Sequence, residues 1–221
     1  MSTKRKYDDG CAAAHALDLV GERWALLIIR ELLLGPKRFT DLRAGMPGAS
    51  PNVLSQRLRE LDGAGVVRRR KLPPPAAAWV YELTEWGQEL EPVVVALGRW
   101  GCQSPTLRDD APINPDALAL SLKARFDPAR TEGFTGRVVL RMGEYSFTVA
   151  LTPDAIDVTR GEPEGPDAVV TAAPETLNAV MRGKVSPAEA VAAGELSVAG
   201  DRERAERFLG LFPIHRLAAA G

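Results

Sequence analysis

The chain has 221 residues, of which 45% are hydrophobic and 26% charged, a composition typical of globular domains. Its length suits two domains of about 100 residues each. No apolar run reaches the roughly 18 residues that span a bilayer, no signal peptide follows the basic start, and two cysteines are too few for a disulfide framework. We therefore expect a cytoplasmic protein with no membrane partner.

The formal net charge of −1 hides an uneven distribution of charge. Residues 1–103 carry a net charge of +3 and residues 104–221 a net charge of −4. The imbalance is sharper over residues 37–71, which hold 9 basic and 3 acidic side chains. A basic zone in an acidic protein indicates a local site for a polyanion, although a solvated charged face is the plain alternative.

Helices are predicted over residues 11–20 and 22–34, separated by Gly21. The second is apolar over most of its circumference, which is typical of a helix at the centre of its domain. Thr40 is then predicted as the N-cap of a short helix with Asp41 in its first turn, ending near Met46.

The next helix is predicted to begin with Ser50 as its N-cap and Pro51 at its first position, and to end near Asp62. Three leucines at helical spacing turn one face inward: Leu54, Leu58 and Leu61. The opposite face carries side chains of the types that hydrogen-bond base edges: Asn52, Ser55, Gln56 and Arg59. Arg57 lies nearer the apolar stripe and is better placed for a phosphate.

Two β-strands are predicted next, over residues 66–72 and 79–83, with a Pro/Ala-rich hairpin tip between them. The first strand carries four consecutive cations, Arg68, Arg69, Arg70 and Lys71. They can meet DNA phosphates beside the groove, or they can simply protect an edge strand from aggregation. Helix-turn-helix pairs also occur in proteins that never bind DNA, but the cationic hairpin after this pair favours DNA. The predicted DNA-binding residues are Thr40, Ser50, Asn52, Ser55, Gln56, Arg57, Arg59, Arg69, Arg70 and Lys71.

Thr84 is predicted to cap a long helix over residues 85–100 with one apolar side. A small winged domain offers such a helix little to pack on, so we expect a partner subunit to cover it. A two-fold homodimer would present two recognition helices to a near-palindromic operator in double-stranded DNA.

Prolines and short polar residues mark a linker at residues 104–113, which divides a first domain at 1–103 from a second at 114–221. In the second domain strands are predicted over residues 137–142, 145–151, 155–159, 168–171 and 196–200. Helices are predicted from Pro115, Pro174 and Pro187 and after Asp201. The expected fold class is α+β, with a winged helix-turn-helix domain followed by an α/β domain that holds a mixed sheet.

Residues 11–101 resemble the HxlR-type regulators, a branch of the MarR-like winged-helix proteins. The resemblance lies in Cys11, Leu32 and residues 16–24, 38–42, 54–61, 65–67 and 81–87. It implies a DNA-binding homodimer. Cys11 matches a position where some relatives carry a cysteine that senses oxidants or electrophiles. The alternative is that Cys11 is a small buried hydrophobic residue, since no cation beside it in the sequence lowers its pKa.

The second half resembles the sterol carrier protein type 2 fold, most clearly at residues 167–170, 181–184 and 194–201. The resemblance implies an apolar cavity that binds an elongated apolar molecule, such as a fatty acyl chain or a sterol. The candidate walls are Phe126, Phe134, Met142, Phe147, Val149, Leu177, Met181, Leu196, Phe208 and Phe212. The alternative is that these side chains simply fill a core.

The predicted function is a DNA-binding transcription regulator, a ligand-responsive repressor that senses an apolar small molecule through its second domain. No cluster of His, Cys, Asp and Glu has metal-ligand spacing and no nucleophile motif is present, so we expect no enzymatic activity, no metal and no cofactor. Two alternatives stay open: a regulator that senses electrophiles through Cys11, and a lipid carrier without DNA function.

Overall fold

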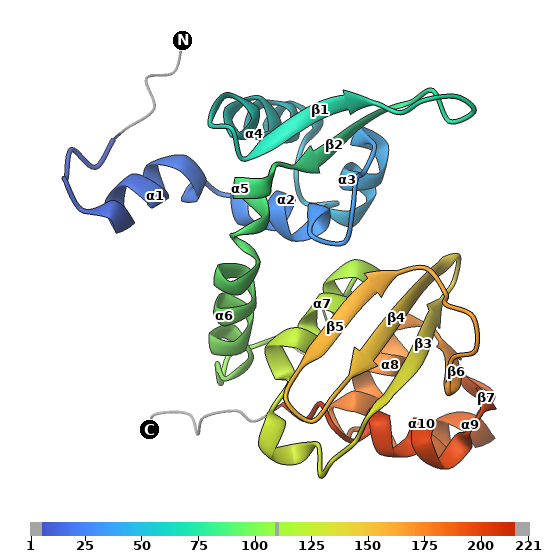
Figure 1. The fold of residues 1–221 in the computed structure, drawn as a ribbon. Coiled ribbons are helices and arrows are strands. Elements are labelled where there is room, and N and C mark those ends of the chain that lie inside the picture. Colours follow the sequence, from blue (N-terminus) through green and yellow to red (C-terminus); the bar gives the residue numbers. More distant parts are fainter. Residues whose placement is uncertain (1–5, 109–110, 215–221) are drawn as a thin grey trace. The chain divides into compact units, whose positions relative to one another are not determined.

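The computed structural model describes residues 6–108 and 111–214, and the chain divides into two compact units between Val94 and Val95 (Figure 1). The first unit is mainly helical with one β-hairpin, and the second combines a five-stranded sheet with helices. The expected α+β class is thereby confirmed. The linker predicted at residues 104–113 stays a prediction.

From residue 6 onward, the first unit contains four helices followed by a hairpin and a short fifth helix. Their bounds are α1 (Ala12–Val20), α2 (Ala25–Leu32), α3 (Phe39–Gly45), α4 (Pro51–Gly63), β1 (Val67–Lys71), β2 (Trp79–Leu83) and α5 (Glu85–Gln88). The next helix, α6 (Glu91–Cys102), runs across the division between the units. Strands β1 and β2 pair antiparallel, as predicted for a wing.

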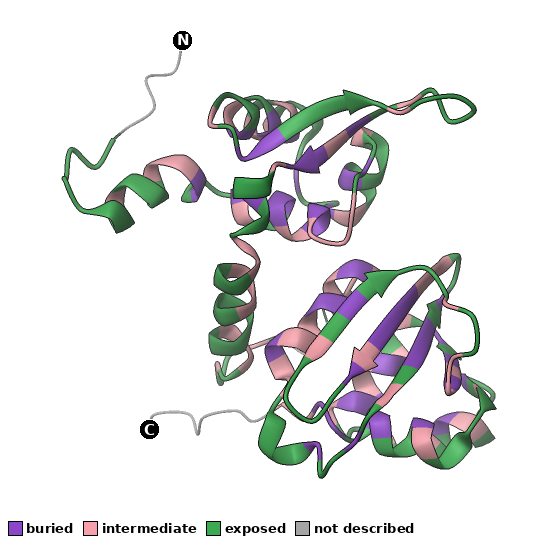
Figure 2. Cartoon of the chain, viewed as in Figure 1, coloured by how far each residue is buried: buried purple, intermediate pink, exposed green. Residues whose placement is uncertain are grey.

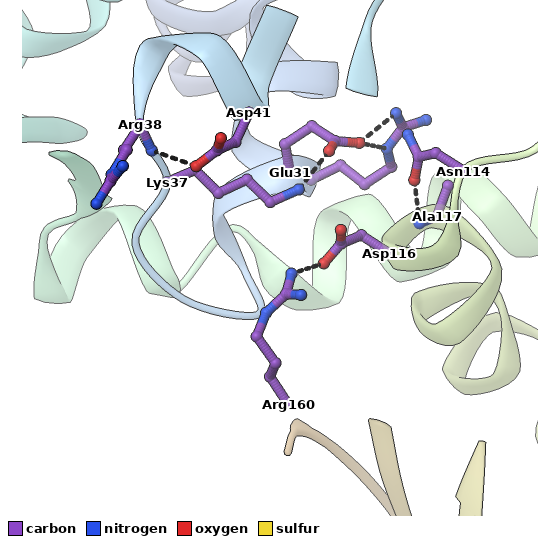
Figure 3. Close-up of polar contacts among 9 residues, drawn as sticks. Glu31, Lys37, Arg38, Asp41, Asn114, Asp116, Ala117 and Arg160 are labelled. Atoms are coloured by element: carbon purple, nitrogen blue, oxygen red, sulfur yellow. Dashed lines mark hydrogen bonds and ion pairs between the residues drawn. The ribbon is translucent and has the colours of Figure 1, made fainter. Parts of the chain in front are cut away.

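Two helix starts differ from prediction. The backbone of Trp24 has a φ of 78°, so α2 begins at Ala25, three residues after the predicted start at Glu22. The N-cap of α3 is Arg38, whose N–H donates to Oδ2 of Asp41 at 3.1 Å (Figure 3). The prediction of Thr40 as N-cap is therefore wrong, because Asp41 supplies the cap from within the helix.

The single helix predicted over residues 85–100 is in fact two, α5 and α6. Thr84 caps α5 as predicted, since its Oγ1 accepts the N–H of Gly87 at 3.0 Å. Pro92 has no N–H to donate to the carbonyl of Gln88, so one helix cannot run through this segment. The chain restarts at Glu91 with Pro92 in the first turn, where an N–H is not needed.

The core of the first unit lies between α2 and α4. Leu54, Leu58 and Leu61 are 0–1% exposed, which confirms the inward face predicted for α4. The predicted cap is also present: Oγ of Ser50 accepts the N–H of Val53 at 3.4 Å, and Pro51 occupies the first helical position. These contacts fix which face of α4 points to solvent.

The second unit is built on a sheet with strand order β5-β4-β3-β6-β7, in which only the β3–β6 pair is parallel. The strands are β3 (Gly136–Met142), β4 (Tyr145–Leu151), β5 (Ile156–Arg160), β6 (Ala168–Ala172) and β7 (Leu196–Gly200). Its helices are α7 (Pro115–Arg125), the short η1 (Pro128–Arg130), α8 (Pro174–Met181), α9 (Pro187–Ala192) and α10 (Arg202–Leu209). The mixed sheet was predicted, and strands β4 and β7 have the predicted bounds.

Local signals place these elements. Gly143 has a φ of +64° at the first position of the β3–β4 turn, and Ser186 and Glu189 form the capping box of α9. Asp116 on α7, 4% exposed, pairs with Arg160 at the end of β5 and ties the helix to the edge of the sheet (Figure 3). The middle of the sheet is buried (Figure 2). Within the described residues, no helix is both long and apolar enough to cross a bilayer.

Candidate nucleic-acid interface

The outward face of α4 presents the side chains predicted to contact bases. Asn52, Gln56 and Arg59 are exposed, and Ser55 is half-buried. Gln56 donates from Nε2 to Oε1 of Glu60 at 3.0 Å, a contact near the surface that duplex DNA can displace. Amide and guanidinium groups on one exposed helical face are suited to the major groove, whose base edges display donors and acceptors in a distinct pattern for each pair.

Arg57 lies differently from its predicted role as a phosphate ligand. Its guanidinium pairs with Glu60 and, at 3.2 Å, with Glu22, and only 15% of its side chain is exposed. These contacts tie α4 to the segment that precedes α2. The residue is thus already engaged in holding the recognition helix in place.

Two hydroxyl groups lie near the start of the helix-turn-helix pair. Thr40 is exposed on α3, and its Oγ1 donates to Oδ1 of Asp41 at 3.2 Å. Ser50 is exposed at the N-terminus of α4, where its oxygen accepts the helix N–H and its hydroxyl hydrogen stays available. Hydroxyl groups at helix N-termini are common phosphate ligands.

The four cations of strand β1 lie on two faces of the wing, with Arg68 and Arg70 on one face and Arg69 and Lys71 on the other. Arg68 and Arg70 converge on Glu82 of β2, with Nε–Oε1 distances of 2.7 and 2.9 Å. Arg70 and then Arg68 hold the pKa of the Glu82 carboxyl below its ordinary value, although burial opposes this. Half of the tetrad is therefore bound to an acid within the protein.

The other two cations, Arg69 and Lys71, are exposed on the opposite face of β1. The Arg69 guanidinium lies 4.4 Å from the centroid of the Trp79 ring, which holds it in position by a cation–π contact. These two exposed side chains are the wing cations that are not bound to Glu82.

A buried ion cluster of Glu31, Lys37 and Arg30 lies next to strand β2 of the wing. It was not predicted from the sequence. Glu31 on α2 is 0% exposed, and its carboxylate lies 2.6 Å from Nζ of Lys37 and 2.7 Å from Nη2 of Arg30. Figure 3 shows Lys37 reaching Glu31. Lys37 also exchanges two backbone hydrogen bonds with Tyr81 of β2. A lone glutamate inside the apolar helix 25–32 was the available signal for a buried pair.

Helix α6 has apolar side chains without cover. Val93, Leu97 and Trp100 are 50%, 49% and 73% exposed, and none of its residues is buried. Exposed apolar side chains at one-turn spacing are unusual on a surface that faces only water.

Cys11 is exposed at the N-terminus of α1. Its interpretation as a buried hydrophobic residue is therefore wrong. The backbone N–H groups of Ala13 and Ala14 lower the pKa of its thiol below the ordinary value, because they stabilise the thiolate. Sequence reasoning considered only side-chain cations and overlooked these helix N–H groups.

In the second unit, the candidate cavity walls lie in the protein interior. Phe126 is half-buried, and the other nine are 0–3% exposed. Phe208 packs against Phe212 and Phe134, with ring centroids 5.1 and 6.4 Å apart. Their role as walls of a ligand cavity stays a prediction. Among the described residues, no group of three or more His, Cys, Asp or Glu side chains is placed to hold a metal ion.

An α3–α4 pair followed by a cationic two-stranded wing defines a helix-turn-helix protein of the transcription-regulator class. Residues 19–107 match the family described as HxlR-like helix-turn-helix, and residues 117–213 match the SCP-2 sterol transfer family.

Relatives are similar in the first half. The HTH-type transcriptional regulator YvaP of Bacillus subtilis (strain 168) is 38% identical over 88 residues, which is 40% of this chain and 82% of that protein. The HTH-type transcriptional regulator YodB of the same organism is 39% identical over 88 residues, 40% of this chain and 79% of that protein. The solved structure of reduced YodB is 35% identical with a TM-score of 0.39, covering 44% of this chain and 97% of that one. The chain belongs to the HxlR-like helix-turn-helix family, and its second unit is of the SCP-2 type.

Proposed function

We propose that this protein is a transcription regulator that binds operator DNA through α4 and the wing. The observation that carries the proposal is the exposed amide and guanidinium face of α4, held outward by three buried leucines beside a cationic hairpin. Asn52, Gln56 and Arg59 would contact base edges, while Arg69 and Lys71 would contact phosphates. Family membership supports this role.

Selection of duplexes from a random pool by the full chain, followed by fluorescence anisotropy on the best duplex, tests this proposal. Arg59→Gln should weaken specific binding by about 1–3 kcal/mol, the value of one good base contact, and relax preference at one position. The control is Arg202→Gln on α10, which removes the same charge outside the proposed interface. Equal affinity of both variants for the selected duplex would contradict the role of Arg59, and failure to enrich any duplex would favour the lipid carrier without DNA function.

We propose further that the active species is a homodimer in which the apolar side chains of α6 are covered by the second copy. Two α4 helices would then enter major grooves one helical turn, about 34 Å, apart. Sedimentation of the wild type and of Leu97→Glu tests this, with Glu89→Leu as the control. The first variant should sediment as a monomer and lose binding to the palindrome, and a dimeric Leu97→Glu protein would contradict the proposal.

The second unit is proposed to bind an apolar small molecule, such as a fatty acyl chain or a sterol, and to act as the sensor of a repressor. The SCP-2 match and the aromatic interior support this. A ligand regulates only if it binds the DNA-competent and the incompetent shape unequally. Titration of the protein–DNA complex with palmitate should release DNA, and unchanged affinity while the fatty acid is bound would contradict the coupling.

A second candidate function rests on Cys11, whose thiol is exposed and has a lowered pKa. Under this proposal an electrophile alkylates the thiolate and changes DNA affinity. N-ethylmaleimide should alter anisotropy titrations of the wild type and leave Cys11→Ser unchanged. A response retained in Cys11→Ser would exclude this cysteine as the sensor.

We propose a binding role, and no catalytic one, for both units. The matched relatives named above are transcription regulators, which supports this for the first unit.

A further inference from the structure

A hollow of about 550 Å³ lies within the second unit and has one residue, Phe126, in common with the candidate cavity walls described above. Its walls come from the last turn of α6, the end of α7, η1 and the chain that follows α10. This volume is within the range of about 300–1,000 Å³ typical of small-molecule sites. The lining is mixed, with Phe126, Pro128, Pro213 and Ile214 beside arginine and aspartate side chains.

Arg125 at the end of α7 is the unusual group in this lining. Its Nη2 donates to Oδ1 of Asn178 at 2.9 Å, but its Nε and Nη1 are buried and have no hydrogen-bond partner among the described residues. A guanidinium stays protonated in proteins and carries five N–H donors. Burial lowers the pKa of Arg125; the Cys102 thiol opposes this, and the charge of Arg182 adds to the lowering. Buried charges of this kind are normally paired with an anion.

The other cations of the hollow are already occupied. Arg99 donates to the carbonyl oxygen of Ala124 at 3.1 Å and thereby holds α6 against α7. Arg130 pairs with Asp127, with an Nε–Oδ2 distance of 3.5 Å. The unused donor capacity at this site therefore belongs to Arg125.

Charge and shape together define what the hollow can hold. Asp127 and Asp154 also line it, so a doubly charged anion such as a phosphate ester would meet about twice the repulsion that a single carboxylate meets. Phe126, Pro128 and Pro213 offer apolar surface to the body of such a molecule. We propose that this hollow binds a small organic carboxylate, with its charged group on Arg125 and its apolar body against these three residues. This site does not depend on the proposed DNA-binding function.

Isothermal titration calorimetry on the full chain tests the proposal with naphthylacetate, the carboxylate anion of naphthylacetic acid, and with the uncharged amide of the same acid, naphthylacetamide. The wild type should bind the acid at least tenfold more tightly than the amide. Arg125→Met should lose at least tenfold in affinity for the acid and none for the amide. The matched control Arg202→Gln also removes one positive charge, from an exposed pair with Glu206 at 2.8 Å, and should bind as the wild type does.

A second readout locates the ligand without altering Arg125. Cys102 lines the hollow and is partly exposed, and in a Cys11→Ser background it is the chain's one remaining thiol. Saturating naphthylacetate should slow alkylation of Cys102 by neutral iodoacetamide at least fivefold, and inorganic phosphate at the same concentration should not. Equal binding of acid and amide, or an unchanged rate of Cys102 alkylation, would overturn the site. Equal protection by phosphate would overturn the assignment of an apolar ligand body.

Discussion

The Glu31 cluster gives a quantitative test of what holds the wing. Replacing Glu31 with leucine keeps a side chain of similar size but removes the acid between Lys37 and Arg30. The Lys37 side chain is 9% exposed, so its ammonium group would lose the carboxylate that lies 2.6 Å away while staying largely out of water. Breaking a buried pair in this way typically costs about 3–5 kcal/mol. We expect Glu31→Leu to lower the free energy of unfolding of the first unit by that amount.

The double variant separates the cost of an unpaired charge from the value of the pair. Lys37→Met leaves Glu31 in contact with Arg30, whose side chain is 23% exposed, so its cost should be smaller, about 1–3 kcal/mol. Glu31→Leu with Lys37→Met removes both buried charges and should be more stable than Glu31→Leu alone, because well-packed apolar replacements of a buried pair are often neutral. The two substitutions are therefore expected to be strongly non-additive.

Urea unfolding followed by tryptophan fluorescence measures these differences, since three of the four tryptophans, Trp24, Trp79 and Trp86, lie in the first unit. The control is Glu89→Leu at an exposed position, expected to change stability by less than about 0.5 kcal/mol. A cost below about 1 kcal/mol for Glu31→Leu, or a double variant whose cost equals the sum of the two singles, would refute the reasoning.

Three further predictions concern packing and ionisation. Leu58→Ala on the buried face of α4 should cost about 2–5 kcal/mol in urea unfolding, because Leu58 is 1% exposed, and a cost below 1 kcal/mol would show that the face is loosely packed. Arg141, and to a lesser extent Ser146, hold the pKa of the Glu162 carboxyl at about 2, below its unfolded value. The stability contributed by the ionised Glu162 carboxylate is therefore complete above its unfolded pKa and is lost as pH falls toward 2. Glu162→Gln should flatten that part of the curve of stability against pH, and an unchanged curve would contradict this prediction. The rate at which Cys11 is alkylated rises with pH as the thiolate forms. Because helix N–H groups favour the thiolate, the midpoint of this rise should lie at a lower pH than the midpoint for an unfolded cysteine peptide. A midpoint at or above that of the peptide would refute this.

Structural features that depend on a short segment of the sequence could be predicted. The apolar spacing of α4, the Ser50 cap and the β3–β4 turn at Gly143 each depend on neighbours along the chain, and the structure has all three. The division of residues 85–102 into two helices was also readable from Pro92, but the apolar periodicity concealed it. The Thr40 cap was predicted wrongly because two possible N-caps, Arg38 and Thr40, lie two residues apart, and the bond from the Arg38 N–H to Asp41 decided between them.

Features that depend on distant partners could not be predicted. Arg68 and Arg70 find Glu82, which is 14 and 12 residues away, and only strand register brings them together. The positive φ of Trp24 likewise has no local signal. In the candidate DNA site, the sequence therefore indicated which side chains are present, and tertiary pairing decides which of them are available.

The pairing of Arg68 and Arg70 with Glu82 changes how the wing should respond to ionic strength. Each lysine or arginine that neutralises a DNA phosphate releases condensed counterions, and the logarithm of affinity falls with the logarithm of salt concentration by about 0.9 per phosphate. Four consecutive cations would suggest a slope near four from each hairpin. Arg68 and Arg70, however, stay paired with Glu82 and would therefore release few counterions from the duplex. Each wing should then contribute a slope nearer two, and Glu82→Gln would make binding tighter at low salt but steeper in its salt dependence.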